Sequence, residues 1–257
     1  MIINEFTNAP GHWLLARMGK RVLRPGGKEL SQKLMSELHI SPNDDIVEYA
    51  PGLGFTAALA LKCNPNTYVG VDADEDVIAL LQKKIHRENV QFILRNAAET
   101  GLESGSKDKV YGEAMLTMHA DRRKSEIISE AHRILKNGGQ YAIHELGLVD
   151  VDDKLKNEIQ RDLASTIKVN ARPLTEAEWR NLLESMGFSV KKVFTNDMYL
   201  LELKRIIDDE GLFRFLKIGC NILRHPQARK RILAMREVFR KHQRHLNAIA
   251  ILAEKIN

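Results

Sequence analysis

The chain has 257 residues, which suits one large domain or one domain with a cap. Hydrophobic residues make up 44% of it and charged residues 28%, as in ordinary globular proteins, and no apolar run is long enough to span a bilayer. The N-terminus lacks the charged start and apolar stretch of a signal peptide, and Cys63 and Cys220 fit no metal-binding spacing. We therefore expect a cytoplasmic protein with reduced cysteines, no transmembrane segment and no bound metal.

The net charge of +5 is unevenly distributed along the chain. Residues 203–245 contain twelve Lys and Arg against four Asp and Glu, a local charge of +8, so the remainder of the chain carries −3. Such asymmetry suits an acidic partner, a membrane surface or an anionic substrate. It also arises when a helix exposes a solvated charged face, which is the commoner case.

In chain order, the first half alternates short apolar runs with amphipathic stretches, after a strong turn signal at Arg24-Pro25-Gly26-Gly27. Strands that alternate with helices predict an α/β fold with a mostly parallel sheet covered by helices on both faces. Periodicity and turn residues predict helices over residues 28–38, 56–62, 77–87 and 125–135, and strands over 45–49, 67–71, 90–94, within 109–116 and over 140–145.

The second half is predicted to be mainly helical. A helix is expected over residues 153–169, and Thr175 with Glu178 forms a capping box that begins another. A strand is expected within residues 188–201, followed by helical residues 203–245. The final stretch, 247–254, fits a strand, with a helix as the alternative because Ala and Leu favour one. An apolar set within the helical segment is expected in its core or in a lid over an apolar substrate: Leu212, Phe213, Phe215, Leu216 and Ile218.

The most informative segment is residues 45–56, where an apolar run ends in an acid and turns through Gly52 and Gly54 into a helix. Glycines let the backbone approach a ligand closely, and the free N–H groups at the start of a helix suit a polar or anionic ligand. The stretch Gly52-Leu53-Gly54-Phe55-Thr56-Ala57 also fits a dinucleotide fingerprint, with Asp72 18 residues after Gly54. Since the chain has no Tyr-x-x-x-Lys pair for hydride chemistry, a nicotinamide dehydrogenase is the least favoured interpretation.

Three side chains favour a different cofactor. Glu48 ends the first strand, where a carboxylate can anchor the cationic α-amino group that nicotinamide dinucleotides lack. Asp72 ends the second strand, where a carboxylate can bind both hydroxyls of a ribose. Asn96 follows the third strand, where an amide can hydrogen-bond an adenine amino group, although it also suits a turn. Together these three side chains are complementary to the amino group, the ribose and the adenine of S-adenosyl-L-methionine.

At this point the chain resembles the class I S-adenosylmethionine-dependent methyltransferases, in particular the broad small-molecule group, over about residues 40–195. The motifs that carry the resemblance are Val47-Glu48-Tyr49-Ala50-Pro51-Gly52-Leu53-Gly54, Val69-Gly70-Val71-Asp72, Asn96-Ala97-Ala98-Glu99, Ala131-His132-Arg133-Ile134-Leu135-Lys136-Asn137-Gly138-Gly139 and Leu174-Thr175-Glu176-Ala177-Glu178-Trp179 with Met186-Gly187-Phe188. Two positions depart from the family pattern: Ala50 replaces its usual first glycine, and Asn96 replaces an aspartate.

The resemblance implies a Rossmann-like, seven-stranded, mostly parallel sheet whose last strand is reversed, with helical cap insertions. We expect an N-terminal helical segment or lid over residues 1–39, a cofactor-binding core over 40–202, a basic helical cap over 203–245 and the terminal strand over 246–257. The expected cofactor contacts are Gly26, Glu48, Ala50, Gly52, Gly54, Asp72, Ala73, Asn96 and Ala97.

The sulfonium methyl group is already activated, so the expected chemistry is direct in-line transfer to a small-molecule acceptor. His119, after the fourth strand, is the first candidate for a general base and Glu145 the second. Two alternatives stay open. One is an RNA- or protein-directed methyltransferase that uses the basic cap, and the other is a non-catalytic domain, suggested by Ala50 and Asn96. Methylation of adenine in DNA is disfavoured because Gly112-Glu113-Ala114-Met115 lacks the expected Asn or Asp, prolines and aromatic residue.

Overall fold

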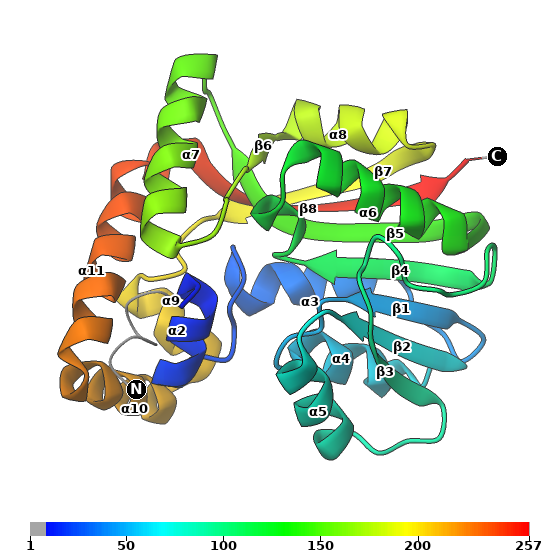
Figure 1. Cartoon of the computed structure of the whole chain (residues 1–257), viewed down its shortest axis with the longest axis horizontal. Coiled ribbons are helices and arrows are strands. Elements are labelled where there is room, and N and C mark those ends of the chain that lie inside the picture. Colours follow the sequence, from blue (N-terminus) through cyan, green and yellow to red (C-terminus); the bar gives the residue numbers. More distant parts are fainter. Residues whose placement is uncertain (1–8, 257) are drawn as a thin grey trace.

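The computed structural model describes residues 9–256, and a mixed α/β sheet organises them (Figure 1). Seven strands run in the order β3-β2-β1-β4-β5-β8-β7, and a short β6 pairs with the end of β5. The parallel part comprises β1 (Asp45–Tyr49), β2 (Thr67–Asp72), β3 (Val90–Leu94), β4 (Lys107–Glu113), β5 (Leu135–Leu148) and β6 (Leu174–Thr175). The terminal strand β8 (Leu246–Lys255) runs antiparallel between β5 and β7 (Phe188–Asp197).

The reversed terminal strand confirms the fold expected from the resemblance, and residues 246–255 form a strand rather than the alternative helix. Burial decides this outcome, because β8 is buried along most of its length between two neighbouring strands. A strand with neighbours on both sides and helices on both faces accepts apolar residues at every position, so Ala and Leu are tolerated there despite their helix propensity.

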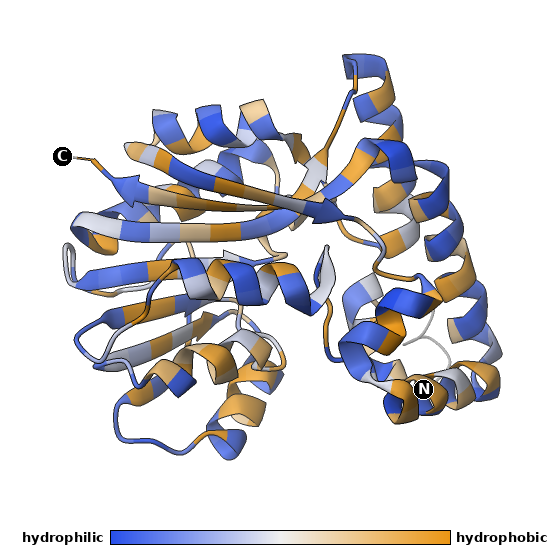
Figure 2. Ribbon diagram, turned by 180° about the vertical axis from the view of Figure 1, so that it is seen from behind, coloured by the Kyte–Doolittle hydropathy of each residue, from blue (hydrophilic) through white to orange (hydrophobic). Residues whose placement is uncertain are grey.

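Helices cover both faces of the sheet. On one face α3 (Gly27–Glu37), α4 (Phe55–Ala60), the turn η1 (Leu61–Cys63) and α5 (Glu75–Lys84) pack on Ile46 and its neighbours. On the other face α6 (Asp121–Ile134) and α8 (Glu176–Ser185) pack on Val47, Tyr49 and their neighbours. Figure 2 shows the orange, apolar residues along the strands between these layers. The capping box of α8 is confirmed, since Thr175 and Glu178 each bind the other's backbone N–H.

A third group of helices lies at the carboxyl ends of the parallel strands (Figure 1). This cap consists of α2 (Gly11–Met18), α7 (Asp153–Ile167), α9 (Leu203–Glu210), α10 (Leu212–Arg224) and α11 (Pro226–Lys241). It has its own apolar core, in which Leu14, Leu163 and Met235 are buried. The expectation for the apolar set of residues 212–218 is wrong for most of its members, because only Ile218 is buried while Leu212, Phe213 and Leu216 are exposed. Among the described helices, none combines the length and the apolar content that crossing a bilayer requires.

Residues 19–26, which we call the strap, connect α2 to α3 and contact the central strands β4 and β5. A cap residue holds one part of the strap, because Glu210 of α9 accepts the N–H groups of Arg21 (2.6 Å) and Val22 (2.9 Å). The core holds the next part, because Arg24 forms a buried ion pair with Glu113 at the end of β4. His144 of β5 completes this contact, with Nδ1 3.0 Å from Glu113 Oε1 and Nε2 2.7 Å from the carbonyl of Pro25.

The charge state of Glu113 is set by this contact. Burial alone would raise the pKa of the Glu113 carboxyl, but the Arg24 guanidinium and the His144 ring outweigh burial and lower the pKa to about 2. Because this folded-state pKa lies below the ordinary value of 4.5, ionised Glu113 stabilises the fold fully above pH 4.5. That contribution is lost as the pH falls from 4.5 toward 2.

Replacing Arg24 by Met is therefore expected to lower the free energy of unfolding at pH 7 by about 3–5 kcal/mol, because it leaves the Glu113 charge buried without its partner. The deficit relative to the unmodified protein should shrink as the pH falls from 4.5 toward 2. Urea unfolding across this pH range measures both effects. Arg21→Met, in the same strap but exposed, is the matched control and should change stability little. A deficit that stays constant with pH would contradict the role of the ion pair.

Candidate functional site

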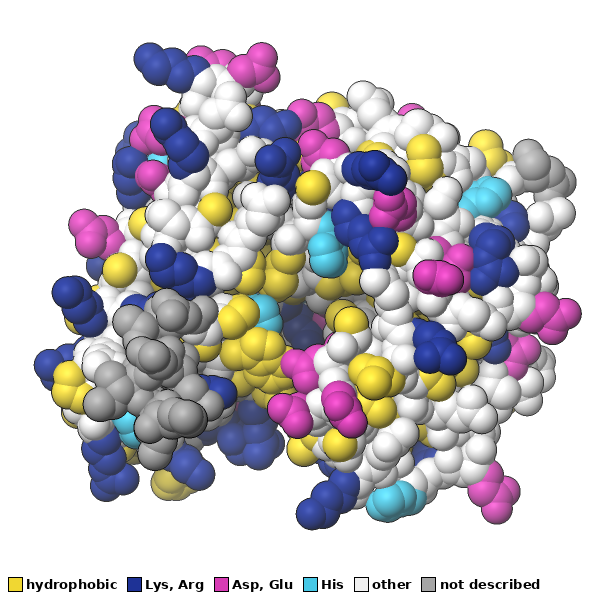
Figure 3. Space-filling model, in the orientation of Figure 1, with side chains coloured by type: hydrophobic (Ala, Val, Ile, Leu, Met, Phe, Trp, Pro, Cys, Tyr) yellow, Lys and Arg dark blue, Asp and Glu magenta, His cyan; other side chains and the backbone are white. Residues whose placement is uncertain are grey.

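A crevice lies between the cap, the strap and the carboxyl ends of the strands, and Figure 3 shows the molecule hollowed there. Ligands of open α/β sheets bind at this end of the strands. The cavity in the crevice has a volume of about 200 Å³. Its lining comes from the turn after β1 (Ala50, Pro51, Gly52, Leu53), the end of β2 (Asp72, Asp74), the end of β4 and the turn after it (Glu113, Ala114, Met115, Met118), α2 (His12, Trp13) and the strap (Arg21, Leu23, Arg24).

The turn after β1 has the left-handed backbone that its glycines predict. Gly52 has φ +53°, and a Cβ built on it would meet no atom nearer than the Ala50 carbonyl oxygen at 3.9 Å, so its backbone is open to a ligand. Gly54 lets the turn pack closely against α5, because a Cβ at this position would lie 2.7 Å from Leu81 Cδ2. Ala50 also has a positive φ, +53°, which costs a non-glycine residue about 1 kcal/mol. The same strained conformation recurs at Ala114, across the crevice.

Asp72 reaches the crevice as the sequence predicts. Its carboxylate is half-buried and accepts the N–H of Asp74 at 3.0 Å. Burial raises the pKa of the Asp72 carboxyl, and backbone hydrogen bonds from Asp74 and Gly52 act against that rise. The neighbouring Asp74 caps α5 by accepting the N–H groups of Asp76 (2.9 Å) and Val77 (3.3 Å). Capping is therefore done by Asp74, which leaves Asp72 suited to a ligand.

Glu48 does not reach the crevice. Its side chain is 2% exposed and lies on the α3–α5 side of the sheet, beneath the glycine turn. The carboxylate accepts hydrogen bonds from the hydroxyls of Thr56 (2.5 Å), Tyr68 (2.5 Å) and Tyr111 (2.8 Å). Burial raises the pKa of Glu48, and the three hydroxyl groups act against the rise. Within the described residues the carboxylate is bonded to protein hydroxyls, and through Thr56 it contacts the first turn of α4.

Four other expected contacts lie outside the cavity lining. Asn96 is exposed, and its Oδ1 accepts the N–H of Ala98 at 3.0 Å, which makes it a turn residue in this structure. Ala73 is exposed and Ala97 is half-buried. Gly26 begins α3 with φ +66°, and a Cβ there would lie 2.7 Å from the Ala248 side chain. The structure therefore brings Ala50, Gly52 and Asp72 together at the cavity, with Gly54 supporting the turn behind them.

A second cavity of about 80 Å³ adjoins the first and shares His12, Leu23, Ala114 and Met118 with it. Most of its lining is apolar. Cap helices contribute Leu15, Ile167, Met235 and Phe239, and the segment after β7 contributes Met198 and Leu200. The polar side chains in the described lining are those of His12, Thr117 and Glu145. This pair of cavities gives the crevice one polar compartment and one apolar compartment.

Glu145, the second candidate base, lines the apolar cavity but its carboxylate is already used. It accepts hydrogen bonds from the N–H groups of Met115, Leu116 and Thr117 at 2.8–3.0 Å and from the Thr117 hydroxyl at 2.7 Å. Burial raises its pKa, and these bonds act against the rise. Glu145 thus organises the turn after β4, which includes η2 (Leu116–Met118). His119, the first candidate base, follows η2 and lines neither of the two cavities.

His12 is the functional candidate that the sequence did not reveal. It lies in the first turn of α2 and borders both cavities, with Trp13 beside it at 5.4 Å between ring centroids. Burial lowers the pKa of the His12 ring and the Asp74 carboxylate acts against that shift, so the ring is neutral at pH 7. Residues 1–27 show weak periodicity and no motif, so only a histidine beside a tryptophan ahead of the strap could have signalled this position.

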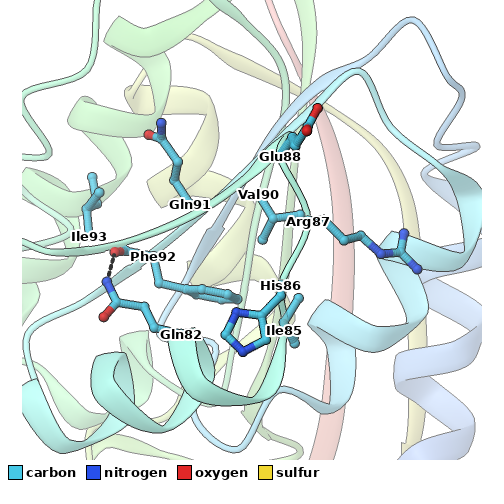
Figure 4. A pocket seen from close by; sticks show the side chains of 9 residues that line it. All are labelled: Gln82, Ile85, His86, Arg87, Glu88, Val90, Gln91, Phe92 and Ile93. Atoms are coloured by element: carbon cyan, nitrogen blue, oxygen red, sulfur yellow. Dashed lines mark hydrogen bonds between the residues drawn. The ribbon is translucent and has the colours of Figure 1, made fainter.

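A wider and more open hollow of about 710 Å³ lies between α5 and the edge strand β3 (Figure 4). It surrounds the start of β3, at the opposite end of the strands from the crevice. The Gln82 side chain there donates a hydrogen bond to the Phe92 carbonyl at 3.1 Å.

A cluster of Glu158, Asp162 and His242 has metal-ligand spacing, but the Lys241 ammonium already contacts both of its carboxylates at 2.8 Å. Neither feature competes with the crevice as a cofactor site.

Comparison with known proteins agrees with this geometry. A family model described as a methyltransferase domain matches residues 46–139, which include the glycine turn and Asp72. An uncharacterised protein of Haemophilus influenzae is 33% identical over 249 residues, which cover 95% of this chain and 98% of that protein. An O-methyltransferase of Dictyostelium discoideum is 26% identical over 168 residues, which cover 64% of this chain and 44% of the relative.

Among solved structures, a phosphoethanolamine N-methyltransferase of Haemonchus contortus in complex with S-adenosylhomocysteine superposes with a TM-score of 0.71. The match covers 98% of this chain and 58% of that one at 16% identity, so it bears on the fold. The open backbone at Gly52 and the carboxylate of Asp72 beside a cavity fit an adenosyl amino acid. Residues 46–139 therefore match a methyltransferase domain, and the fold of the chain is shared with a methyltransferase solved in complex with S-adenosylhomocysteine.

Proposed function

We propose that this enzyme binds S-adenosyl-L-methionine in the crevice and transfers its methyl group in line to an apolar small molecule held in the cavity beside His12. The observation that carries the proposal is the apolar cavity that shares four lining residues with the more polar crevice. The crevice suits the cofactor, and the adjoining cavity suits an acceptor that approaches the sulfonium methyl group from the cap side.

In this arrangement the turn at Ala50 and Gly52 presents its backbone to the amino-acid half of the cofactor. Asp72 binds the ribose hydroxyls, and Glu48 acts indirectly by fixing the turn through Thr56. The segment after β3 lies beside Asp72, since the N–H of Arg95 donates to the Asp72 carbonyl at 2.9 Å. Ala73, Asn96 and Ala97 are therefore assigned to the rim of the adenine site, next to the ribose.

The lining of the second cavity argues for an apolar acceptor. No Lys or Arg is part of its described lining, so a phosphate or carboxylate buried there would lose its hydration without gaining a cationic partner. Its small volume of about 80 Å³ supports a small molecule over a polymer. The basic residues 203–245 supply less free charge for RNA than their number suggests, because Arg236 and Arg240 bind Glu202 while Lys241 binds Glu158 and Asp162.

The chemical step is a nucleophilic substitution at the methyl carbon. A lone pair of an acceptor O–H or S–H group forms the new bond to carbon as the carbon–sulfur bond breaks, and its electron pair stays on sulfur to give S-adenosylhomocysteine. The acceptor proton passes to the neutral His12 ring, which borders both cavities.

The acceptor class can be tested with S-adenosylmethionine that carries a radiolabelled methyl group. The enzyme is given a pair of acceptors, an apolar phenol or thiol and the phosphorylated or carboxylated analogue of the same molecule. We expect it to label the apolar member of the pair. Labelling only of charged analogues or of RNA would overturn the proposal.

Asp72→Asn is expected to weaken the binding of S-adenosylhomocysteine by about 10- to 100-fold, because it replaces charge-assisted hydrogen bonds that contribute about 1.5–3 kcal/mol. Isothermal titration calorimetry measures this change. The matched control is Asp76→Asn, an exposed acid in the first turn of α5 that is not part of the cavity lining, and its affinity should stay the same. Equal losses in the two variants would indicate a general effect of charge and would count against the ribose role of Asp72.

His12→Gln is expected to lower the rate of methyl transfer by about 10²- to 10⁴-fold, the range of general-base catalysis, while the affinity for S-adenosylhomocysteine changes little. Because burial lowers the His12 pKa below its ordinary value of 6.5, the rate of the unmodified enzyme should fall only at pH values below 6.5. Initial rates with the labelled acceptor measure both effects. His119→Gln tests the candidate base from the sequence, and a loss confined to that variant would transfer the role to His119.

A further inference from the structure

The helix α10 exposes a continuous apolar stripe. Leu212, Phe213, Leu216 and Leu223 are 56%, 90%, 54% and 65% exposed, and Cys220 between them is also exposed. At 100° per residue these five positions fall within one side of the helix, because they follow the i, i+4 and i+3 spacing. Large apolar side chains scattered singly on a surface need no explanation, but a stripe along three turns of one helix does.

The opposite side of α10 is fixed to the cap. Ile218 is buried, and the Asn221 amide donates to the Met18 carbonyl at 3.0 Å, at the end of α2. The exposed stripe is therefore a consequence of how the helix is anchored, since turning the stripe inward would remove both contacts. In Figure 2 the helix next to the N label carries orange residues although it lies at the periphery of the molecule.

Cations border the stripe. Lys217 and Arg224 lie beside it on α10, and Arg229 and Lys230 follow in the first turns of α11. None of these four makes an ion pair with any residue of the described range 9–256, and all four are exposed. No acidic residue occurs in α10. Figure 3 shows Lys and Arg side chains gathered at this end of the molecule.

We propose that α10 and the start of α11 form a docking surface for an anionic lipid bilayer. A helix lies in a membrane interface when it presents large apolar side chains toward the acyl region and Lys or Arg toward the headgroups. The stripe of α10 supplies the first requirement, and the four unpaired cations supply the second by attraction to anionic headgroups. This proposal goes beyond the methyl-transfer reaction and does not depend on the acceptor.

The observations favour a bilayer over other occupants. In a symmetric contact with a second copy, Lys217 and Arg224 would approach their own counterparts and repel them. An RNA would engage the cations but would leave Phe213 and three leucines against its charged backbone. A bilayer with anionic lipid is the surface that satisfies the apolar stripe and the cations together.

Co-sedimentation of the full chain with vesicles tests the proposal. Binding is expected to vesicles of phosphatidylcholine mixed with phosphatidylglycerol at low salt, to weaken at least tenfold at high salt, and to be weak with phosphatidylcholine alone. Phe213→Ser combined with Leu223→Ser should reduce binding at least tenfold, as should Lys217→Gln combined with Arg224→Gln. The matched control is Leu80→Ser, a 44%-exposed leucine of α5 outside the surface, which should bind as the unmodified protein does.

Unchanged thermal unfolding and S-adenosylhomocysteine binding in each variant establish that the fold is intact. Equal sedimentation of all variants, or no sedimentation of the unmodified protein at low salt, would overturn the proposal. A concentration-dependent dimer that Phe213→Ser abolishes would assign the stripe to a second copy instead. Salt-sensitive RNA binding that survives Phe213→Ser, without vesicle binding, would assign the cations to a polymer.

Discussion

The buried ion pair between Arg24 and Glu113 is the contact on which the closed crevice depends. It joins the strap to the end of β4, and His144 extends it to the Pro25 carbonyl. The strap in turn is tied to α9 by Glu210, so a cap helix, a connecting segment and two sheet strands meet at one charged cluster. A buried ion pair adds little to stability compared with apolar packing, but it demands one geometry. Here that geometry places Leu23 and Arg24 over the cavity.

Glu48 illustrates what a sequence motif can and cannot specify. The chain order predicts that an acid ends β1 before a glycine turn, and the structure has it there. In a strand, however, successive side chains point to opposite faces, and the face is decided by packing partners far away in the sequence. Tyr68 and Tyr111 come from the two strands that flank β1, and their hydroxyls donate hydrogen bonds to the Glu48 carboxylate in the interior of the protein. An acid at a strand end therefore identifies the motif without identifying the contact.

Much of the fold could be predicted because its signals are local. The strands at 45–49 and 90–94 coincide with β1 and β3, since apolar runs there end at turn residues. The sequence pattern predicts that α6 starts at residue 125, whereas the helix begins at Asp121. Its first turn is polar and gives no periodicity, yet the side chain of Lys124 is buried by long-range contact with the Arg172 carbonyl. The sequence gives no local signal for His12 either, because only the folded cap brings α2 to the crevice.

The Lys and Arg residues of the basic segment 203–245 fall into two groups in the structure, those with an ion-pair partner and those without an ion-pair partner among the described residues. Nearby acids form ion pairs with Arg205, Arg214, Arg236, Arg240 and Lys241. An exposed pair such as that of Lys241 with Glu158 contributes about 0–1 kcal/mol to stability. The positive charge of these paired residues is largely neutralised in the fold. The cations at the junction of α10 and α11, which have no ion-pair partner among residues 9–256, keep theirs, and they lie beside apolar side chains that the cap leaves outside its core. Four cations of the segment thus keep their charge beside exposed apolar side chains, and that coincidence, rather than the total of +8 over residues 203–245, distinguishes the proposed docking surface from a solvated helix face.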